Sequence, residues 1–245
     1  GAPPLSCGAG HSEDLGSHLT SWLHLPPSRI RPASRTSPLP DRPKELRSRD
    51  QHMSIATKCR IVEEPMNRLA EYGTIPIRFE VRSIFEVVGD DPATAVLQEK
   101  PEPTPWTKDY DAMKGEGPTR WAKNRDISNW GLLAAYLDDQ RVGGAVLAFN
   151  TDGINKLEGR DDLTALWDLR IHPDYRRQGI GRKLFAAAVA WARQRNCREL
   201  KIETQNINVP GCRFYQQQGC HLSSIDRASY NDLPDEVELI WCLTL

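Results

Sequence analysis

The chain has no long apolar run and almost no excess of either charge. No stretch of about eighteen apolar residues occurs, so the sequence predicts no membrane-spanning helix. The formal net charge is -1 at pH 7, which argues against a general nucleic-acid binder, because such proteins carry a strong basic excess. With 39% hydrophobic residues among 245, the chain has enough apolar material for a sizeable core. We therefore expect a globular protein whose partners include neither a membrane nor a nucleic acid.

Metal-binding spacings are also absent. The six cysteines form no C-x-x-C pair, and no two histidines lie at the spacing of a zinc site. Reduced, packed thiols in a reducing cytosol account for this pattern. We expect a cytoplasmic protein without a bound metal. Its free cysteines would be Cys7, Cys59, Cys197, Cys212, Cys220 and Cys242.

Residues 1–52 differ in composition from the rest of the chain. Prolines cluster there among many serines and arginines, and apolar periodicity is absent. Such a segment buries too little apolar surface to offset the entropy of ordering, so we expect disorder. It lacks the apolar centre of a secretory signal. Its serines and arginines would suit an organelle transit peptide, but its prolines and acidic residues argue against one. Because Met53 is a plausible native start, we interpret residues 1–52 as an upstream or artificially added extension and residues 53–245 as the folded domain.

Periodicity divides the folded part into strands and helices. Apolar and polar residues alternate from Ile75 to Arg82, as in a half-buried strand. Four prolines between Pro92 and Pro105 predict a linker, and residues 106–127 predict a loop with one short helix near a site. The further predicted elements are a hairpin (129–137 and 141–149), strand 165–171, helix 183–195, strand 199–204, helix 209–218, and strands near 221–229 and 236–245. This order predicts a mixed α/β (α+β) domain over one central sheet.

The stretch R-R-Q-G-I-G-R-K, residues 176–183, stands between a predicted strand and a predicted helix. The first N–H groups of a helix have no internal partner, and the helix dipole adds partial positive charge there. Glycine lets an anion approach the backbone, and four basic side chains surround the two glycines. A dinucleotide fingerprint is excluded because residue 184 is Leu, and the nucleotide P-loop pattern is absent. The stretch predicts a phosphate site, the alternative being a plain helix terminus with a solvated arginine face.

Residues 169–184, L-R-I-H-P-D-Y-R-R-Q-G-I-G-R-K-L, resemble the central motif of the GNAT superfamily of acyl-CoA N-acyltransferases. The resemblance implies a single domain with a central mixed, mostly antiparallel, twisted sheet flanked by helices, and acetyl-CoA as cosubstrate. It also implies that the strand at Leu169, Arg170 and Ile171 pairs with the pantetheine arm. The pyrophosphate positions that it implies are Arg176, Arg177, Gln178, Gly179, Ile180, Gly181 and Arg182.

A second motif, N-V-P-G-C-R-F-Y-Q-Q-Q-G-C at residues 208–220, resembles a downstream motif of the same superfamily. It departs from the usual pattern at Gly211, where alanine is commoner, and at Cys220, where phenylalanine is usual. The resemblance implies that Asn208 lies in the cofactor site and that Tyr215 protonates the departing thiolate. The alternative for Tyr215 is an ordinary core tyrosine.

Three shorter strings resemble streptothricin acetyltransferases within the superfamily. They are K-D-Y-D (108–111), I-E-T-Q-N-I-N (202–208) and D-E-V-E-L-I-W (235–241). This resemblance implies an acetyl-CoA-dependent N-acetyltransferase acting on a primary amine of a small molecule, such as a streptothricin- or aminoglycoside-like antibiotic or a polyamine. An antibiotic-resistance role would follow. The alternatives are a protein lysine or N-terminal acetyltransferase, and a non-catalytic CoA-binding module, which the intact glycines and Tyr215 disfavour.

Acetyl transfer to an amine requires a neutral amine, a polarised thioester carbonyl and a proton for the thiolate. Asp168 is the preferred amine-binding or base-like group, because an acid in an apolar strand is costly unless it is paired or functional. Its alternative is a salt bridge, for example to Arg170. Glu203 on the next strand is a second candidate, and water is a third.

The acceptor site is expected in the segment before the hairpin. Acidic side chains beside aromatic ones suit a cationic amine through charge pairing and cation–π contact. The candidate residues are Asp109, Tyr110, Asp111 and Trp121, with a solvated loop as the alternative. We expect a monomer or a homodimer.

Overall fold

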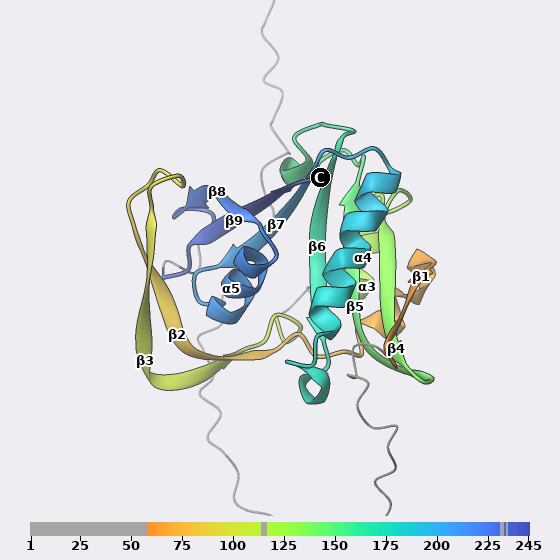
Figure 1. Cartoon of the computed structure of the whole chain (residues 1–245), viewed down its shortest axis with the longest axis horizontal. Coiled ribbons are helices and arrows are strands. Elements are labelled where there is room, and N and C mark those ends of the chain that lie inside the picture. The colour runs from red at the N-terminus through yellow and green to blue at the C-terminus, as the bar shows by residue number, and fades with distance from the viewer. Residues whose placement is uncertain (1–57, 114–116, 231–232, 234) are drawn as a thin grey trace, which may run out of the picture.

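The computed structural model describes residues 58–113, 117–230, 233 and 235–245, and the extension predicted at residues 1–52 lies outside them. The centre of the fold is a seven-stranded sheet in the order β1-β4-β5-β6-β7-β9-β8 (Figure 1). Its neighbouring strands are antiparallel, except for the parallel pair β6 and β7. The mixed, mostly antiparallel sheet confirms the predicted fold class. The strands of this sheet are β1 (Arg60–Glu64), β4 (Gly131–Leu137), β5 (Gln140–Phe149), β6 (Leu163–Ile171), β7 (Glu199–Gln205), β8 (His221–Asp226) and β9 (Glu238–Thr244).

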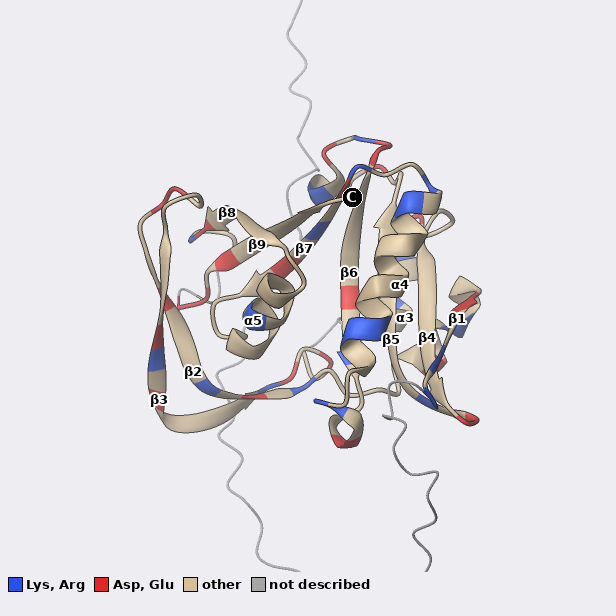
Figure 2. Cartoon of the chain, in the orientation of Figure 1, with Lys and Arg blue, Asp and Glu red and all other residues tan. Residues whose placement is uncertain are grey.

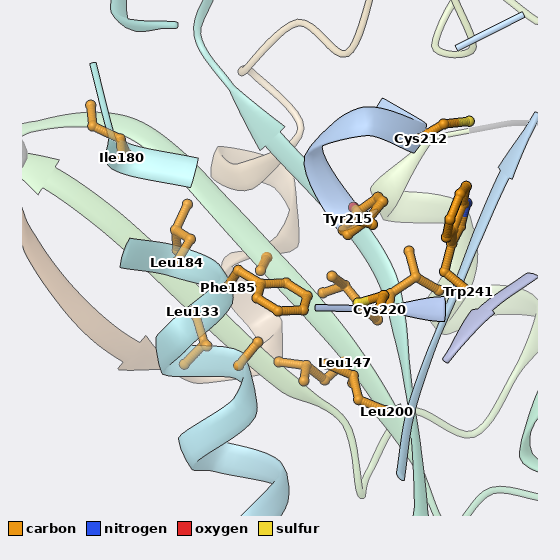
Figure 3. Packing of buried hydrophobic residues seen from close by; sticks show 14 of the residues in the cluster. Leu133, Leu147, Ile180, Leu184, Phe185, Leu200, Cys212, Tyr215, Cys220 and Trp241 are labelled. Carbon is orange, nitrogen blue, oxygen red and sulfur yellow. The ribbon is translucent and has the colours of Figure 1, made fainter. Parts of the chain in front are cut away.

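Helices cover both faces of the sheet, because side chains along each strand point alternately to one face and the other. The larger hydrophobic core lies under α4 (Ile180–Gln194) and α5 (Val209–Gln217), where Phe185 and Tyr215 pack with strand residues (Figure 3). A second core lies on the opposite face, where Tyr72 and Trp130 pack with Trp121. The short elements are η1 (Met66–Arg68), α2 (Leu69–Tyr72), α3 (Pro118–Asn124), η2 (Asn155–Leu157) and η3 (Pro173–Tyr175).

The periodicity located most of these elements. The hairpin β4–β5, strands β6 to β9 and helix α5 lie where they were predicted, and the short helix expected within residues 106–127 is α3. Helix α4 begins at Ile180 rather than at Lys183, because Gly179 caps it with a left-handed backbone (φ 84°). The strand expected from Ile75 begins only at Phe79. Strand β1 and helix α2 were not predicted, because both are short.

The predicted linker across Pro92 to Pro105 was wrong. Residues Val96–Lys108 form β3, which pairs with β2 (Phe79–Val88) in a separate two-stranded sheet. The register jumps between the pairs Ser83–Pro101 and Val81–Trp106, so the later prolines lie in a bulge. Among the described residues β3 has β2 as its one partner, and proline is tolerated on such an edge because no ladder N–H is lost.

Strands β6 and β7 separate partway along their length. Their pairing runs from Leu163–Glu199 to Leu166–Ile202 and then stops, although β6 continues to Ile171 and β7 to Gln205. On its other side, β6 has a bulge against β5, because Val146 is opposite Asp168 while Leu147 is opposite Leu166. A bulge bends and twists its strand, so it directs the end of β6 away from β7.

The described cysteines are buried and none of them is in a disulfide, as predicted; Cys7 lies outside the described residues. Within the described part of the chain, no helix is both long and apolar enough to cross a membrane.

Candidate active site

A cleft of about 1110 Å³ opens where β6 and β7 diverge. The ends of both strands, the starts of α4 and α5, and the segment that carries Tyr110 line it. The cleft brings together every predicted site residue except Asp109, Gln178 and Ile180. Those that line it are Asp168, Leu169, Arg170, Ile171, Arg176, Arg177, Gly179, Gly181, Arg182, Glu203, Asn208, Tyr215, Tyr110, Asp111 and Trp121.

The turn before α4 presents unused backbone donors. Arg177 and Gly179 have left-handed backbones, with φ of 62° and 84°. The first hydrogen bond of the helix runs from the N–H of Lys183 to the carbonyl of Gly179 (3.2 Å), and the N–H groups of residues 177–182 donate to no other described residue. The side chains of Arg177 and Arg182 are exposed and form no ion pair with the described residues. This turn can therefore hold a phosphate group through amides, helix dipole and arginine charge.

Three predicted cofactor residues use their side chains elsewhere. Ile180 is 1% exposed and packs in the core. Gln178 donates from Nε2 to the carbonyl of Asp174 (3.0 Å). Asn208 caps α5 by accepting a hydrogen bond from the N–H of Gly211 (3.0 Å). Gln178 and Ile180 can therefore contribute backbone groups only.

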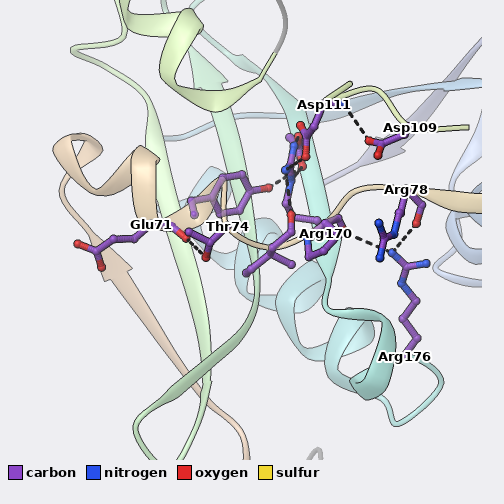
Figure 4. Close-up of polar contacts among 11 residues, drawn as sticks. Glu71, Thr74, Arg78, Asp109, Asp111, Arg170 and Arg176 are labelled. Carbon is purple, nitrogen blue, oxygen red and sulfur yellow. Dashed lines mark hydrogen bonds and ion pairs between the residues drawn. The ribbon is translucent and has the colours of Figure 1, made fainter. Parts of the chain in front are cut away.

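Arg176 secures the chain rather than facing solvent (Figure 4). Its guanidinium donates to the carbonyls of Ile171 (3.0 Å), Arg78 (2.9 Å) and Pro76 (3.3 Å). Burial and the charge of Arg78 lower its pKa. The side chain thus fastens the segment before β2 to the end of β6, a role that the motif did not predict.

Beyond Leu166 one edge of β6 has no strand partner among the described residues. Leu169, Arg170 and Ile171 lie on this stretch, and their other edge pairs with β5. A free strand edge can pair with an extended ligand arm, because its backbone groups already point outward.

Asp168 is the centre of a buried polar network, of which Figure 4 labels Arg170 and Asp111. Its Oδ1 accepts from the hydroxyl of Tyr72 (2.6 Å) and from Nε of Arg170 (3.1 Å), and its Oδ2 accepts from Nη2 of Arg170 (2.6 Å). Arg170 also donates from Nη1 to Oδ2 of Asp111 (2.9 Å) and to the carbonyl of Ile75 (3.0 Å). The salt bridge weighed as the alternative for Asp168 is therefore present, and its carboxylate also lines the cleft.

Tyr72 is a functional neighbour that sequence reasoning missed. It lies in α2 and is fully buried, and burial together with the charge of Asp168 raises its pKa, so it remains a proton donor to that carboxylate. Gly144 on β5 makes room for it, because a Cβ there would lie 2.7 Å from the ring of Tyr72.

Tyr215 is 8% exposed and packs its ring against Phe185 and Phe214 (Figure 3). Burial and the negative charge of Asp168 raise its pKa. The phenol is therefore neutral at ordinary pH, and both Tyr215 and Asp168 line the cleft.

Glu203 carries a second polar network. Its Oε1 accepts from the hydroxyl of Tyr230 (2.5 Å), and its Oε2 is paired with the ammonium of Lys156. Gln205 links this network to Tyr110, because its Nε2 donates to the hydroxyl of Tyr230 (2.8 Å) and its Oε1 accepts from the hydroxyl of Tyr110. The sequence offered no periodic signal for Lys156 or Tyr230, since both lie in connections between strands.

Strand alternation sorts the lining of the cleft into two sides. Ile202 packs in the core beneath α4 and α5, so Glu203 points to the opposite face. Trp167 and Trp121 lie on that face too, with ring centroids 6.3 Å apart and planes at 83°. Trp167, which the prediction did not include, is on the bulge of β6 and lines the cleft. Tyr215 and the turn before α4 are on the α4/α5 side.

We name the side opposite α4 and α5 the acidic chamber, defined by Asp111, Trp121, Trp167, Asp168 and Glu203. Four carboxylates stand in and beside it, those of Asp111, Asp168, Glu203 and the neighbouring Glu238. Two cations, Arg170 and Lys156, pair with these carboxylates, and the guanidinium of a third, Arg125, lies over the ring of Trp167, 5.1 Å from its centroid. In Figure 2 acidic residues mark β6, β7 and β9, whereas basic ones mark the start of α4. The chamber therefore carries an excess of negative charge, whereas the turn before α4 carries the positive charge of Arg177 and Arg182.

Asp109 lies outside the cleft lining, where its carboxylate accepts from the N–H of Asp111 (3.1 Å) and so orders that turn. No group of three or more His, Cys, Asp or Glu side chains in the described residues is placed to hold a metal ion.

The model of the acetyltransferase (GNAT) family matches residues 93–220 of this chain. Streptothricin acetyltransferase A of Bacillus subtilis (strain 168) is 28% identical over 108 residues, which cover 43% of this chain and 57% of the relative. The streptothricin acetyltransferase of Streptomyces lavendulae is 26% identical over 162 residues, 65% of this chain and 80% of the relative. Among solved structures, a putative streptothricin acetyltransferase from Bacillus anthracis str. Ames, in complex with acetyl coenzyme A, shares the fold with a TM-score of 0.60 and 24% identity over 76% of this chain and 99% of that one.

Proposed function

This chain belongs to the acetyltransferase (GNAT) family, and we propose that it transfers the acetyl group of acetyl-CoA to a primary amine of a small cationic molecule of the streptothricin type. The observation that carries the proposal is a single cleft with a phosphate-binding turn on one side of the sheet and an acidic chamber on the other. A negatively charged cosubstrate and a positively charged acceptor would each meet the side of opposite charge.

The cosubstrate would enter from the α4/α5 side. The N–H groups of residues 177–182 and the side chains of Arg177 and Arg182 would hold its diphosphate. Its pantetheine arm would extend along the free edge of β6 at Leu169 to Ile171 and bring the thioester to the point where β6 and β7 separate.

The acceptor would enter the acidic chamber. Asp111 and Asp168 would attract its ammonium, and the ring of Trp121 would add cation–π contact, since the guanidinium of Arg125 already lies over the ring of Trp167. Glu203 lies on the same face but on the next strand, β7, whereas Asp168 is on β6. It would bind a second polar or charged group of the acceptor rather than the reacting amine. An amine without other charge would gain less from this chamber.

The chemistry would take place between Asp168 and Tyr215. One lone pair of the Asp168 carboxylate is free of the three hydrogen bonds that hold it, and this oxygen would take the proton of the ammonium. The neutral nitrogen would bond to the acetyl carbon, the bond between that carbon and sulfur would break, and the nitrogen would release its extra proton to solvent, which leaves a neutral amide. Tyr215 would give its proton to the departing thiolate and would be reprotonated from solvent.

The experiment measures consumption of acetyl-CoA by the purified protein with streptothricin, spermidine, an aminoglycoside, and peptides offering a lysine or an N-terminal alanine. We expect turnover of the small cationic amines. Turnover of a peptide with none of the small amines would replace the proposal by a protein acetyltransferase. Binding of acetyl-CoA with no turnover of any acceptor would favour a non-catalytic module.

A further inference from the structure

Lys156 reaches into the acidic chamber from a connection outside the two motifs at residues 169–184 and 208–220. It lies in η2, in the connection between β5 and β6, and its side chain is 14% exposed. Its ammonium pairs with Glu203 and lies 3.9 Å from Oε2 of Glu238. Two pairs of carboxylates therefore lie on this face of the sheet, Asp111 with Asp168 and Glu203 with Glu238. Lys156 occupies the second pair.

The carboxylates around Lys156 need a cation. Glu203 and Glu238 lie diagonally on the neighbouring strands β7 and β9, where Glu238 pairs with Gln205 and Glu203 with Ile240. Burial together with the charge of Glu203 raises the pKa of Glu238. Their neutral donors are the hydroxyl of Tyr230 (2.5 Å) and Nε2 of Gln205 (3.3 Å) to Glu203, and the hydroxyl of Ser229 to Glu238 (3.0 Å). Lys156 supplies the one positive charge that the described residues place between them.

The two cations that pair with the carboxylates of the chamber differ in how firmly they are held. The side chain of Arg170 is 2% exposed and donates to Asp168, Asp111 and the carbonyl of Ile75, so a ligand could not displace it without leaving several buried groups unpaired. Lys156 is held by carboxylates alone, on a flexible stem with a compact, strongly hydrated head. A second ammonium on the acceptor would therefore compete with Lys156, not with Arg170.

We propose that Lys156 determines acceptor specificity by limiting the number of positive charges that the chamber accepts. The inference rests on the proposed function, since it concerns the acceptor of the same reaction. With Lys156 in place, one ammonium of the acceptor binds at Asp168 and Asp111. A second ammonium must displace the Lys156 ammonium from Glu203 and Glu238, and because Lys156 is part of the chain, its effective concentration there is high. Without Lys156, the carboxylates of Glu203 and Glu238 become open to the far ammonium of a diamine.

The test compares the wild type with Lys156→Met against a graded series of straight-chain diamines and the monoamines of matching length. Removing the tethered ammonium should lower KM for diamines of suitable length by roughly tenfold and leave KM for the matching monoamines within about twofold. Lys156→Gln serves as a second neutral variant, in case the methionine variant folds poorly, and Lys156→Arg keeps the charge and should retain the wild-type ratio.

Lys201→Met is the matched control. Lys201 is on β7 two residues before Glu203, its side chain is 15% exposed, and it pairs with Glu158 (2.5 Å) without lining the cleft. Each lysine thus forms a partly covered ion pair between β7 and the connection from β5 to β6. Loss of the Lys201 charge should leave the ratio of diamine to monoamine KM unchanged.

Equal shifts of KM for diamines and monoamines, or no shift, would overturn the inference. If the wild type acetylates no small amine, the proposed function fails by itself. Calorimetric titration of the same amines in the presence of CoA then decides about Lys156. Tighter diamine binding in Lys156→Met alone supports its role, and equal binding in both proteins rejects it.

Discussion

The phenol of Tyr215 keeps its proton because of its surroundings. Aromatic rings cover it, and the carboxylate of Asp168 disfavours a second negative charge nearby. A neutral phenol at this place can protonate a thiolate, which forms only when the acetyl group leaves. The same contacts would also suit a core tyrosine, so turnover must separate the two interpretations.

Tyr215→Phe should lower kcat by about 10²- to 10⁴-fold, because it removes the proton donor and keeps the ring. Acetyl-CoA affinity, measured by calorimetry, should stay close to that of the wild type. Wild-type turnover in this variant would assign Tyr215 to the core alone.

The side chains of Arg170 and Asp168 are 2% and 5% exposed, so water cannot compensate the charge of either one if the other is removed. Asp168→Asn should lower the free energy of unfolding by about 3 to 5 kcal/mol, because it leaves a buried guanidinium without its main counter-charge. Denaturant unfolding followed by circular dichroism measures this. Asp111→Asn is the matched control: its side chain is 29% exposed, so the loss should be clearly smaller. Equal losses would mean that Asp168 is not the residue that compensates Arg170.

At the scale of elements, the start of α4 combines a left-handed glycine, a run of free amides and two exposed arginines. Each feature alone is common, and together they favour the binding of an anion, because backbone donors, dipole and charge point to one place. The glycine is required by its φ of 84°, which a side chain with a Cβ adopts only with strain.

Gly179→Val should weaken acetyl-CoA binding by roughly tenfold or more, because a left-handed residue with a branched side chain costs about 1 to 2 kcal/mol and shifts the amides. Gly153→Val is the control. Gly153 also has a positive φ (72°), but a Cβ added to it would have no atom within 4 Å, and it is outside the cleft lining. Calorimetry on both variants tests the assignment, which unchanged affinity in Gly179→Val would refute.

At the scale of the molecule, the β2–β3 hairpin stands beside the main sheet, as Figure 1 shows, and Asn206 connects the two. The N–H of Phe85 on β2 donates to the carbonyl of Asn206 (2.9 Å), and the side-chain amide of Asn206 donates to the carbonyl of Phe85 (3.1 Å). On the side of the main sheet, the N–H of Asn206 donates to the carbonyl of Val237 (3.0 Å). The N–H of Val237, which lies next to β9, donates to Oδ1 of Asn206 (2.8 Å). This buried residue helps to keep the hairpin beside the cleft.

The packed thiols offer a test of the whole fold. Burial raises the pKa of Cys212 and Cys220 to about 11, and burial with the charge of Glu199 raises that of Cys242 to about 12. Few thiolates should therefore exist at neutral pH in the native state. In a Cys7→Ser variant, a thiol reagent should label the native protein at least about 10²-fold more slowly than the denatured protein. Fast labelling without loss of secondary structure would show that these cores open locally.

The periodic elements were predictable because their signals are local. Alternation along β5 and β6, and the apolar face of α4, appear in any short window of the chain. Strand β3 was not predictable in this way, since its prolines resemble a linker and only the pairing with β2 makes it a strand. Among the site residues, the glycine turn could be predicted from consecutive residues, whereas Tyr72, Lys156 and Trp167 could not.

The sequence by itself determined the order of the elements from β4 to β9 and the glycine turn before α4, because both follow from the preferences of neighbouring residues. Only the tertiary structure decided which charges meet. Tyr72 reaches Asp168 across 96 positions, and Lys156 reaches Glu203 from a connection between strands. These contacts depend on strand register and on the separation of β6 from β7, and side-chain contacts across a sheet cannot be derived from local periodicity.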